Sequence, residues 1–275
     1  MHRNEGLYRL FPGGLFQDSA PGTRVTDDWL NAVQEELCGV ISAAGYTVLS
    51  AATDNWGQLW PAIAALAGTP AKGYAVYASP ASGGTWWPSS YGRVLGDKIT
   101  VTVVGAGGGG GGVSALIYAT GGGAGGFGLS LYTLSAFNIN SGVTITIGSG
   151  GAGGASGLTS GIAGTTTSWG TYITTTGGGG GFPNPTTGEG GIGGTSVGGN
   201  LLNNNGSPAT GLISGAGGNG ADSPLGGGAG RGGRGSIAEN GGAATAPGAG
   251  GGGGGYLNTS RAGGAGANGM VLITW

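Results

Sequence analysis

The stretch VTVVGAGGGGGG, residues 101–112, begins as a strand and ends in six consecutive glycines. Its first four residues are β-branched, which is typical of a strand. Glycine loses more conformational freedom on folding than any other residue, so an ordered run of six needs many stabilising neighbours. Two interpretations compete: a disordered tether that follows a strand, or a folded object built from backbone alone.

Glycine dominates the composition, with 74 of 275 residues, against an average of about 7%. The glycines are irregularly spaced and there are only 11 prolines, which excludes a collagen triple helix. Disordered chains are rich in net charge and poor in aromatic residues. This chain has a net charge of −2, with 7 Trp, 9 Tyr and 5 Phe. The composition therefore favours a folded protein.

Charge and cysteine content exclude several classes of function. Nine basic residues against eleven acidic ones leave no electrostatic footprint for nucleic acid. No apolar run approaches the roughly 18 residues of a membrane span, and the first residues lack the apolar stretch of a signal peptide. One His, His2, and one Cys, Cys38, cannot form a structural zinc site. We therefore expect no metal and no cofactor.

Composition divides the chain into three zones. We predict an N-terminal segment with short helices over residues 1–70, a connector with entry strands over 71–98, and a glycine-rich β and polyglycine-helix domain over 99–275. After Lys98 charged residues become rare. They are Glu189, Asp222, Arg231, Arg234, Glu239 and Arg261.

The first zone contains a clear helix signal at residues 25–46, VTDDWLNAVQEELCGVISAAGY. Thr26 is suited to the N-cap and Gly45 to the stop. Apolar residues recur at alternating spacings of three and four, an a/d stripe typical of helices that pack against copies of themselves. They are Leu30, Val33, Leu37, Val40 and Ala44. Packing against its own domain is the alternative. A second helix is predicted at 59–67.

Five segments of the glycine-rich zone have the β-branched and aromatic composition of strands. They are 98–105, 128–134, 142–148, 167–175 and 269–275. The last strand is expected to pair with the first and to close a sheet. A disordered tether would not be expected to end in a strand that closes a sheet.

The glycine blocks between these strands predict a second kind of element. A left-handed extended helix of the polyproline type has three residues per turn and no internal hydrogen bonds. Glycine helices of this type can approach closely, because they have no Cβ, and can bond to one another. We therefore predict a mainly β fold with a polyglycine-II helix bundle. A short α-helical N-terminal segment precedes an antiparallel sheet that frames the packed glycine-rich helices.

Four stretches, in order, resemble the glycine-rich domains of bacteriophage tail fibres and tail adhesins. They are KITVTVVGAGGGGGG, GVTITIGSGGAGG, GTTTSWGTYITTTGGGGG and GANGMVLITW. The resemblance covers about residues 86–275, and residues 22–66 are similar to the N-terminal part of many phage tail-fibre proteins. It implies an extracellular virion protein, usually a homotrimer, joined to a baseplate or tail protein through its N-terminal segment.

The same resemblance implies that loops on the glycine-rich head bind a glycan or an outer-membrane protein of the bacterial surface. Loops are also where binding residues concentrate. The candidates are Tyr118, Phe182, Asn184, Asn203, Asn204, Asn205, Tyr256, Asn258 and Arg261. The alternative is that these residues only close turns, since Asn is a common turn former.

Two other functions compete with receptor binding. The chain could be a purely structural tail-fibre or baseplate-attachment component. An enzyme is not expected, because hydrolysis of sugars generally needs two positioned carboxylates. The glycine-rich zone offers only Glu189, Asp222 and Glu239.

Overall fold

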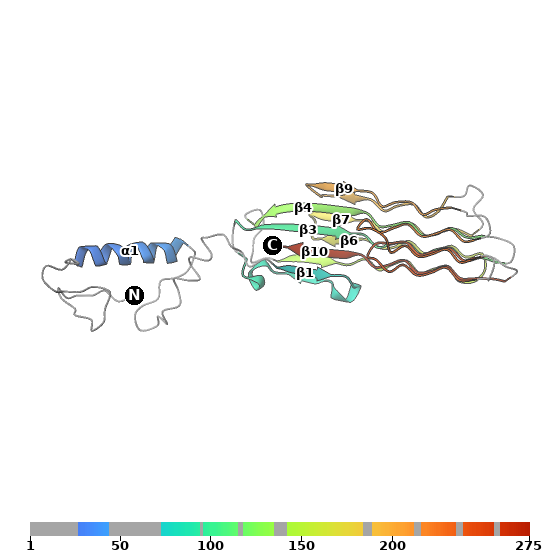
Figure 1. Cartoon of the computed structure of the whole chain (residues 1–275), viewed down its shortest axis with the longest axis horizontal. Coiled ribbons are helices and arrows are strands. Elements are labelled where there is room, and N and C mark those ends of the chain that lie inside the picture. The colour runs from blue at the N-terminus through green and yellow to red at the C-terminus, as the bar shows by residue number, and fades with distance from the viewer. Residues whose placement is uncertain are drawn as a thin grey trace. The chain divides into compact units, whose positions relative to one another are not determined.

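The chain divides into two compact units, Met1–Lys72 and Gly73–Trp275, and each is described by itself (Figure 1). The computed structural model describes residues 27–43, 73–93, 96–114, 118–134, 142–183, 189–211, 216–234, 239–255 and 259–275.

The first unit contains the helix α1, Asp27–Ala43, where the sequence predicts it. Within it Val33, Leu37 and Val40 are half-buried, and Ile41 is buried. The side chain of Leu30 lies outside the described residues, as do Ala44, both predicted caps and the second predicted helix.

The second unit is built on two antiparallel sheets of five strands each. The first sheet has the order β1-β10-β3-β4-β9, with bounds Tyr74–Tyr77, Met270–Thr274, Lys98–Val104, Phe127–Thr133 and Leu202–Asn204. The second has the order β2-β5-β6-β7-β8, with bounds Gly84–Trp86, Val143–Thr146, Thr167–Trp169, Ile173–Thr175 and Ser196–Val197. Two short 3₁₀ helices, Pro80–Ser82 and Pro88–Tyr91, accompany the early strands.

Apolar side chains from both sheets form one core. In β3 every second residue is fully buried, as period-two alternation requires: Ile99, Val101 and Val103. The second sheet contributes Trp86 and Trp169, whose ring centroids lie 6.3 Å apart. The remaining core residues include Val143, Ile145, Ile147, Ile173, Val271 and Ile273.

The predicted strands are confirmed with one change. The segment 167–175 is a hairpin of β6 and β7 and not a single strand, and it turns at Gly170, where φ is +55°. As expected, the last strand β10 pairs with β3, and it also pairs with β1. The short strands β1 and β2 lie within residues 71–98, where entry strands were expected without individual bounds, whereas β8 and β9 were not predicted.

The predicted polyglycine-II helix bundle is wrong as the fold class. The fold is mainly β, and the regular elements of the described residues are two antiparallel sheets, the helix α1 and two short 3₁₀ helices, where one framing sheet was expected. In the described residues the glycine-rich segments carry no helix. Their hydrogen bonds join parts of the chain that are remote in sequence. The β-branched strands, and not the glycine blocks, therefore supply the regular structure.

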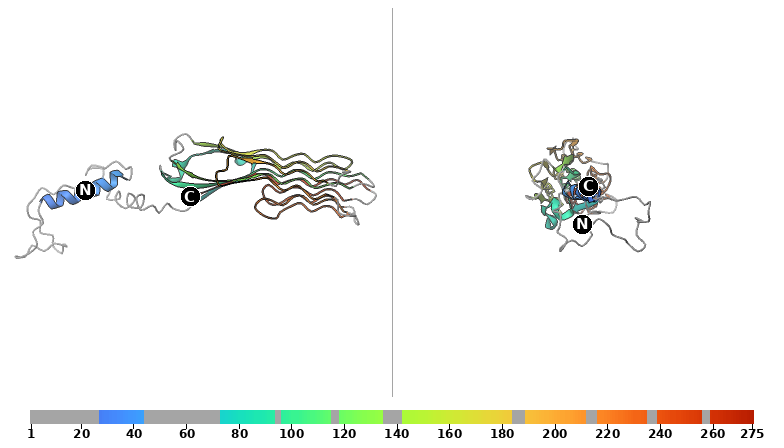
Figure 2. Two further views of the ribbon diagram at one scale, coloured as in Figure 1. Left: turned by 90° about the horizontal axis from the view of Figure 1, so that it is seen from above. Right: turned by 90° about the vertical axis from the view of Figure 1, so that its left-hand side faces the viewer.

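The glycine-rich segments instead form extended stretches that run away from the sheets and return to them (Figures 1 and 2). We call this set the glycine array, the end nearest the strands its sheet end, and the opposite end its far end. Its segments are 105–113, 119–126, 148–155, 159–166, 176–183, 189–195, 205–211, 216–223, 228–234, 239–245, 248–255 and 261–269.

Three of these segments, 105–113, 119–126 and 248–255, are buried at every residue. Their backbone N–H groups donate to different neighbours in rotation. In the first segment Gly108, Gly109 and Gly110 donate to Gly123, Ile162 and Gly264, each at 2.9 Å. The next three residues donate to the same three neighbouring segments in the same order. Buried backbone groups must be paired, and here other backbone segments pair them.

At many glycines of the inner segments the neighbouring backbone lies so close that a Cβ does not fit. A Cβ at Gly110 would overlap the backbone carbonyl of Gly252. The obstacle is backbone that is itself hydrogen-bonded, so it cannot move aside as a flexible side chain can.

Substitution of Gly110 by Ala should therefore destabilise the second unit. We expect a loss of about 3 kcal/mol or more, the upper end of overpacking costs, measured as the free energy of urea unfolding. The control is Gly84→Ala in β2, where a Cβ meets no atom within 4 Å. It should change stability by less than about 0.5 kcal/mol. Equal unfolding midpoints for the two variants would contradict close packing at Gly110.

Candidate functional site

The far end of the array brings together residues that are distant in the sequence. Isolated antiparallel bridges join Val113 to Arg261, Ala119 to Pro183 and Ala216 to Arg234. Each bridge lies at the end of its segments opposite the strands, so the described residues at these positions share one end of the unit.

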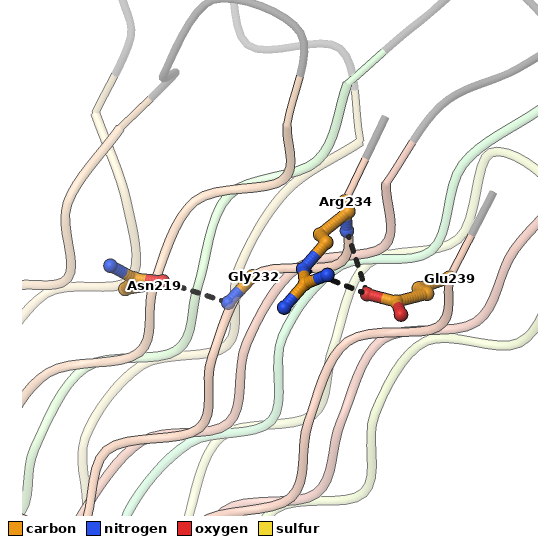
Figure 3. Close-up of polar contacts among 4 residues, drawn as sticks. All are labelled: Asn219, Gly232, Arg234 and Glu239. Atoms are coloured by element: carbon orange, nitrogen blue, oxygen red, sulfur yellow. Dashed lines mark hydrogen bonds and ion pairs between the residues drawn. The ribbon is translucent and has the colours of Figure 1, made fainter. Parts of the chain in front are cut away.

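An outer segment of the array lacks a neighbouring segment on one side. There, polar side chains accept hydrogen bonds from its backbone N–H groups. The Asn219 carboxamide oxygen accepts the N–H of Gly232 at 2.8 Å (Figure 3). Asn240 and Asn268 likewise accept the N–H groups of Ala262 and Gly150, at 3.1 and 2.9 Å. Threonine hydroxyls do the same for other outer segments: those of Thr120, Thr165, Thr176 and Thr210. Several outer backbone N–H groups are thus bonded to polar side chains instead of carbonyls.

Arg234 and Glu239 meet at the far end (Figure 3). The Arg234 Nε lies 3.8 Å from the Glu239 Oε2, and the backbone N–H of Arg234 donates to the same oxygen at 3.4 Å. The side chains are 51% and 42% exposed. An exposed pair of this kind stabilises a fold by less than about 1 kcal/mol. The contact orients the Arg234 guanidinium more than it stabilises the fold.

Two further arginines lie in segments that are hydrogen-bonded to the segment of Glu239. Arg231 is exposed on the same segment, three residues before Arg234, and no partner for its side chain is found among the described residues. Arg261 is half-buried. Its Nε is buried without a hydrogen-bond partner in the part of the chain that the structure describes.

Three of the residues predicted to bind a receptor lie at the far end. Tyr118 is half-buried beside Ala119, and Phe182 is 49% exposed. The backbone N–H of Phe182 donates to the Thr120 hydroxyl at 2.8 Å, and its carbonyl accepts the Thr120 N–H at 3.0 Å. Arg261 is the third of these residues.

The predicted run Asn203, Asn204 and Asn205 lies elsewhere, in and directly after β9 at the sheet end. The side chain of Asn203 closes its own turn. It accepts the N–H of Gly199 at 2.9 Å and donates to the Gly199 carbonyl at 2.6 Å. The structure therefore does not bring this run together with Phe182. The remaining candidates, Asn184, Tyr256 and Asn258, lie outside the described residues.

The three carboxylates of the glycine-rich zone are spread over the array. Glu239 is at the far end, whereas Asp222 adjoins Ser223, whose hydroxyl donates to the Pro247 carbonyl near the sheet end. Glu189 is exposed at the start of another segment. No group of His, Cys, Asp and Glu that could hold a metal ion occurs in the described ranges. Within those ranges no helix has the length and apolar character of a membrane span.

The fold and the site together define a glycine-rich β protein in which a backbone array presents side chains at one end. Residues 80–275 match the family described as a glycine-rich domain, and the chain belongs to that family. No curated protein matches the chain.

Sequence analysis missed the asparagines that bond the outer segments and the arginines beside Glu239. Asn219, Asn240 and Asn268 are each followed directly by glycine, in or beside a glycine block. A polar residue at such a place could have signalled an outer segment. The arginines gave no such signal, because their proximity depends on how the segments are arranged.

Asn219→Ala should leave the buried N–H of Gly232 without its acceptor. An unpaired buried donor costs about 1–3 kcal/mol, so we expect faster amide exchange at Gly232 and a lower unfolding temperature. Asn219→Asp keeps an oxygen at the same place and should retain most of the protection. Unchanged exchange at Gly232 in the alanine variant would show that the side chain is not the acceptor.

Proposed function

We propose that this chain is a phage tail-fibre protein that binds the surface of its bacterial host through the far end of the glycine array. One observation carries the proposal: the segments of the glycine array end together, and exposed side chains such as Phe182 and Arg234 gather there. The sequence resemblance to tail fibres and adhesins supports the same function.

The array suits a display role for a physical reason. Its inner segments are held by backbone hydrogen bonds at every position, so residues at the far end can change without repacking a side-chain core beneath them. Binding residues concentrate on connecting segments held by a rigid scaffold. Aromatic and arginine side chains also contribute the largest share of binding energy at interfaces.

The N-terminal unit has a different role in this proposal. It joins the virion, as a baseplate or tail attachment, and the helix α1 associates with two further copies to give a homotrimer. The half-buried residues Val33, Leu37 and Val40 recur at the spacing that such a seam requires. The protein would then act outside the bacterial cell, as part of the virion.

Phe182→Ala should weaken binding of the full chain to host cells about tenfold, since loss of a central aromatic contact is typically worth at least 1.4 kcal/mol. Binding is measured with fluorescently labelled protein on a panel of bacterial strains. The matched control is Leu225→Ala, because Leu225 is 48% exposed in the turn after Ser223 at the sheet end. Its binding should not change.

Two results would contradict receptor binding at the far end. Equal loss of binding in both variants would indicate a general effect on the fold. Absence of binding to every strain, with adsorption of the virion unaffected by an excess of free protein, would favour the structural alternative. In that case the chain would only connect or extend the fibre.

Leu37→Glu should convert the trimer to a monomer, because a carboxylate in each chain would be buried against its copies. The mass of the intact chain in solution, measured by light scattering, checks this. Glu36→Gln changes an exposed position of the same helix and should leave the mass of three chains. A monomeric wild-type chain would refute the trimer.

A further inference from the structure

The far end carries an unusual concentration of charge for this protein. Arg231, Arg234 and Arg261 lie in segments that are hydrogen-bonded to the segment of a single carboxylate, Glu239, although the whole chain has a net charge of −2. These three are the only basic residues after Lys98. Arg231 and Arg234 are exposed, so their guanidinium groups are accessible to an anion from outside the protein.

The backbone places the three arginines around one inner segment. A Cβ at Gly255 would lie 2.8 Å from the backbone carbon of Arg234, and a Cβ at Gly254 would lie 3.0 Å from the Arg261 carbonyl. The Gly255 N–H also donates to the Glu239 carbonyl at 3.0 Å. Arg234, Glu239 and Arg261 therefore border the end of the same buried segment.

Arg231 occupies a position equivalent to that of Arg234. Backbone donation from their segment repeats every three residues, from Gly230 and Gly233. The neighbouring segment offers Glu239 to Arg234 but only Gly242 to Arg231, where the Gly242 N–H donates to the Arg231 carbonyl at 2.7 Å. Arg234 thus has a carboxylate residue at the neighbouring position, whereas Arg231 has a glycine there.

The concentration of arginines is one indication of a ligand, and Arg261 gives another that is independent of it. Its buried Nε has no partner among the described residues, and an unpaired buried donor of a charged group is costly. A bound anion would satisfy it. Beside the cluster, Asn219 uses its oxygen for Gly232 (Figure 3), so its amide nitrogen is left to bond a ligand oxygen.

We propose that Arg231, Arg234 and Arg261 form an anion-binding site for the phosphate, sulfate or carboxylate groups of an acidic surface polysaccharide. The choice of a cell-surface polysaccharide rests on the proposed function, whereas the anion site rests on the cluster itself. Planar guanidinium groups match such oxyanions with paired hydrogen bonds. A small cluster on a chain of net negative charge suits widely spaced acidic groups, whereas nucleic-acid binding needs an extended basic surface.

Titration of the full chain with labelled dextran sulfate, and with uncharged dextran of equal length, tests the site. Wild-type protein should bind only the sulfated polymer, and more weakly as salt rises. Arg231→Gln should weaken binding about fivefold and the Arg231→Gln, Arg234→Gln double variant at least about tenfold, as for lost charge-assisted hydrogen bonds. Glu239→Gln removes the competing carboxylate and should tighten binding about twofold.

Lys98→Gln is the matched control. Lys98 is exposed at the start of β3, at the sheet end, so its loss removes the same charge from the opposite end and should leave binding unchanged. Equal weakening by Lys98→Gln and Arg231→Gln would overturn the site, because it would indicate attraction by net charge alone. Equal binding of the uncharged polymer, or tighter binding of single-stranded DNA of matched charge, would also overturn the proposal.

Binding of the same variants to host cells separates this inference from the proposed function. Cell binding that falls with the arginine variants supports both. Cell binding that persists unchanged in the double variant would refute the polysaccharide site and leave receptor binding in place. Failure to bind any cell, with arginine-dependent binding of dextran sulfate intact, would refute the proposed function and leave the anion site in place.

Discussion

Inside the glycine array, nearly all inner backbone N–H groups that donate do so to a carbonyl of a different segment. The side chains buried between the segments are few and mostly alanine, such as Ala124. A backbone hydrogen bond of this kind stabilises the fold by about 0.5–1.5 kcal/mol net. Fixing the backbone of one residue costs about 1–2 kcal/mol of conformational entropy, so the hydrogen bonds do not exceed this cost. The array therefore cannot be stable alone. Burial of apolar side chains between the two sheets, with Trp86 and Trp169 fully buried, supplies the stabilising free energy that the glycine segments do not.

The sheets also set the register of the array. β3 leads directly into the inner segment 105–113, and the inner segment 119–126 leads directly into β4. These strands are paired over their whole length, from Lys98 with Thr133 to Val104 with Phe127. Hydrogen bonding then continues past the strands, because Gly105 donates to Gly126 at 2.8 Å. Because the register is fixed at the strands, the first carbonyls of the array are aligned with their donors. The later carbonyls of the same segments are then aligned as well.

The strands were predictable because β-branched residues and period-two alternation are local signals, as in residues 98–104. The hairpin at Gly170 and the short strands β8 and β9 were not, because pairing with remote segments decides them. The glycine blocks indicated close packing of the backbone. They did not indicate which secondary structure the blocks form, since composition alone does not set backbone geometry. At the candidate site, Tyr118, Phe182 and Arg261 were found from sequence diversity. Arg231, Arg234 and Glu239 were missed, since only the arrangement of segments brings them near Arg261.

The perimeter of the array limits where a binding surface can evolve. Outer residues such as Asn219, Asn240 and Asn268 bond neighbouring backbone, so replacing them disturbs the scaffold. Glycines of the inner segments cannot gain a side chain at all. Variation without structural cost is therefore confined to the ends of the segments and to outward positions such as Arg231. In the proposed function, a change of receptor would alter these positions and leave the hydrogen-bonded array untouched.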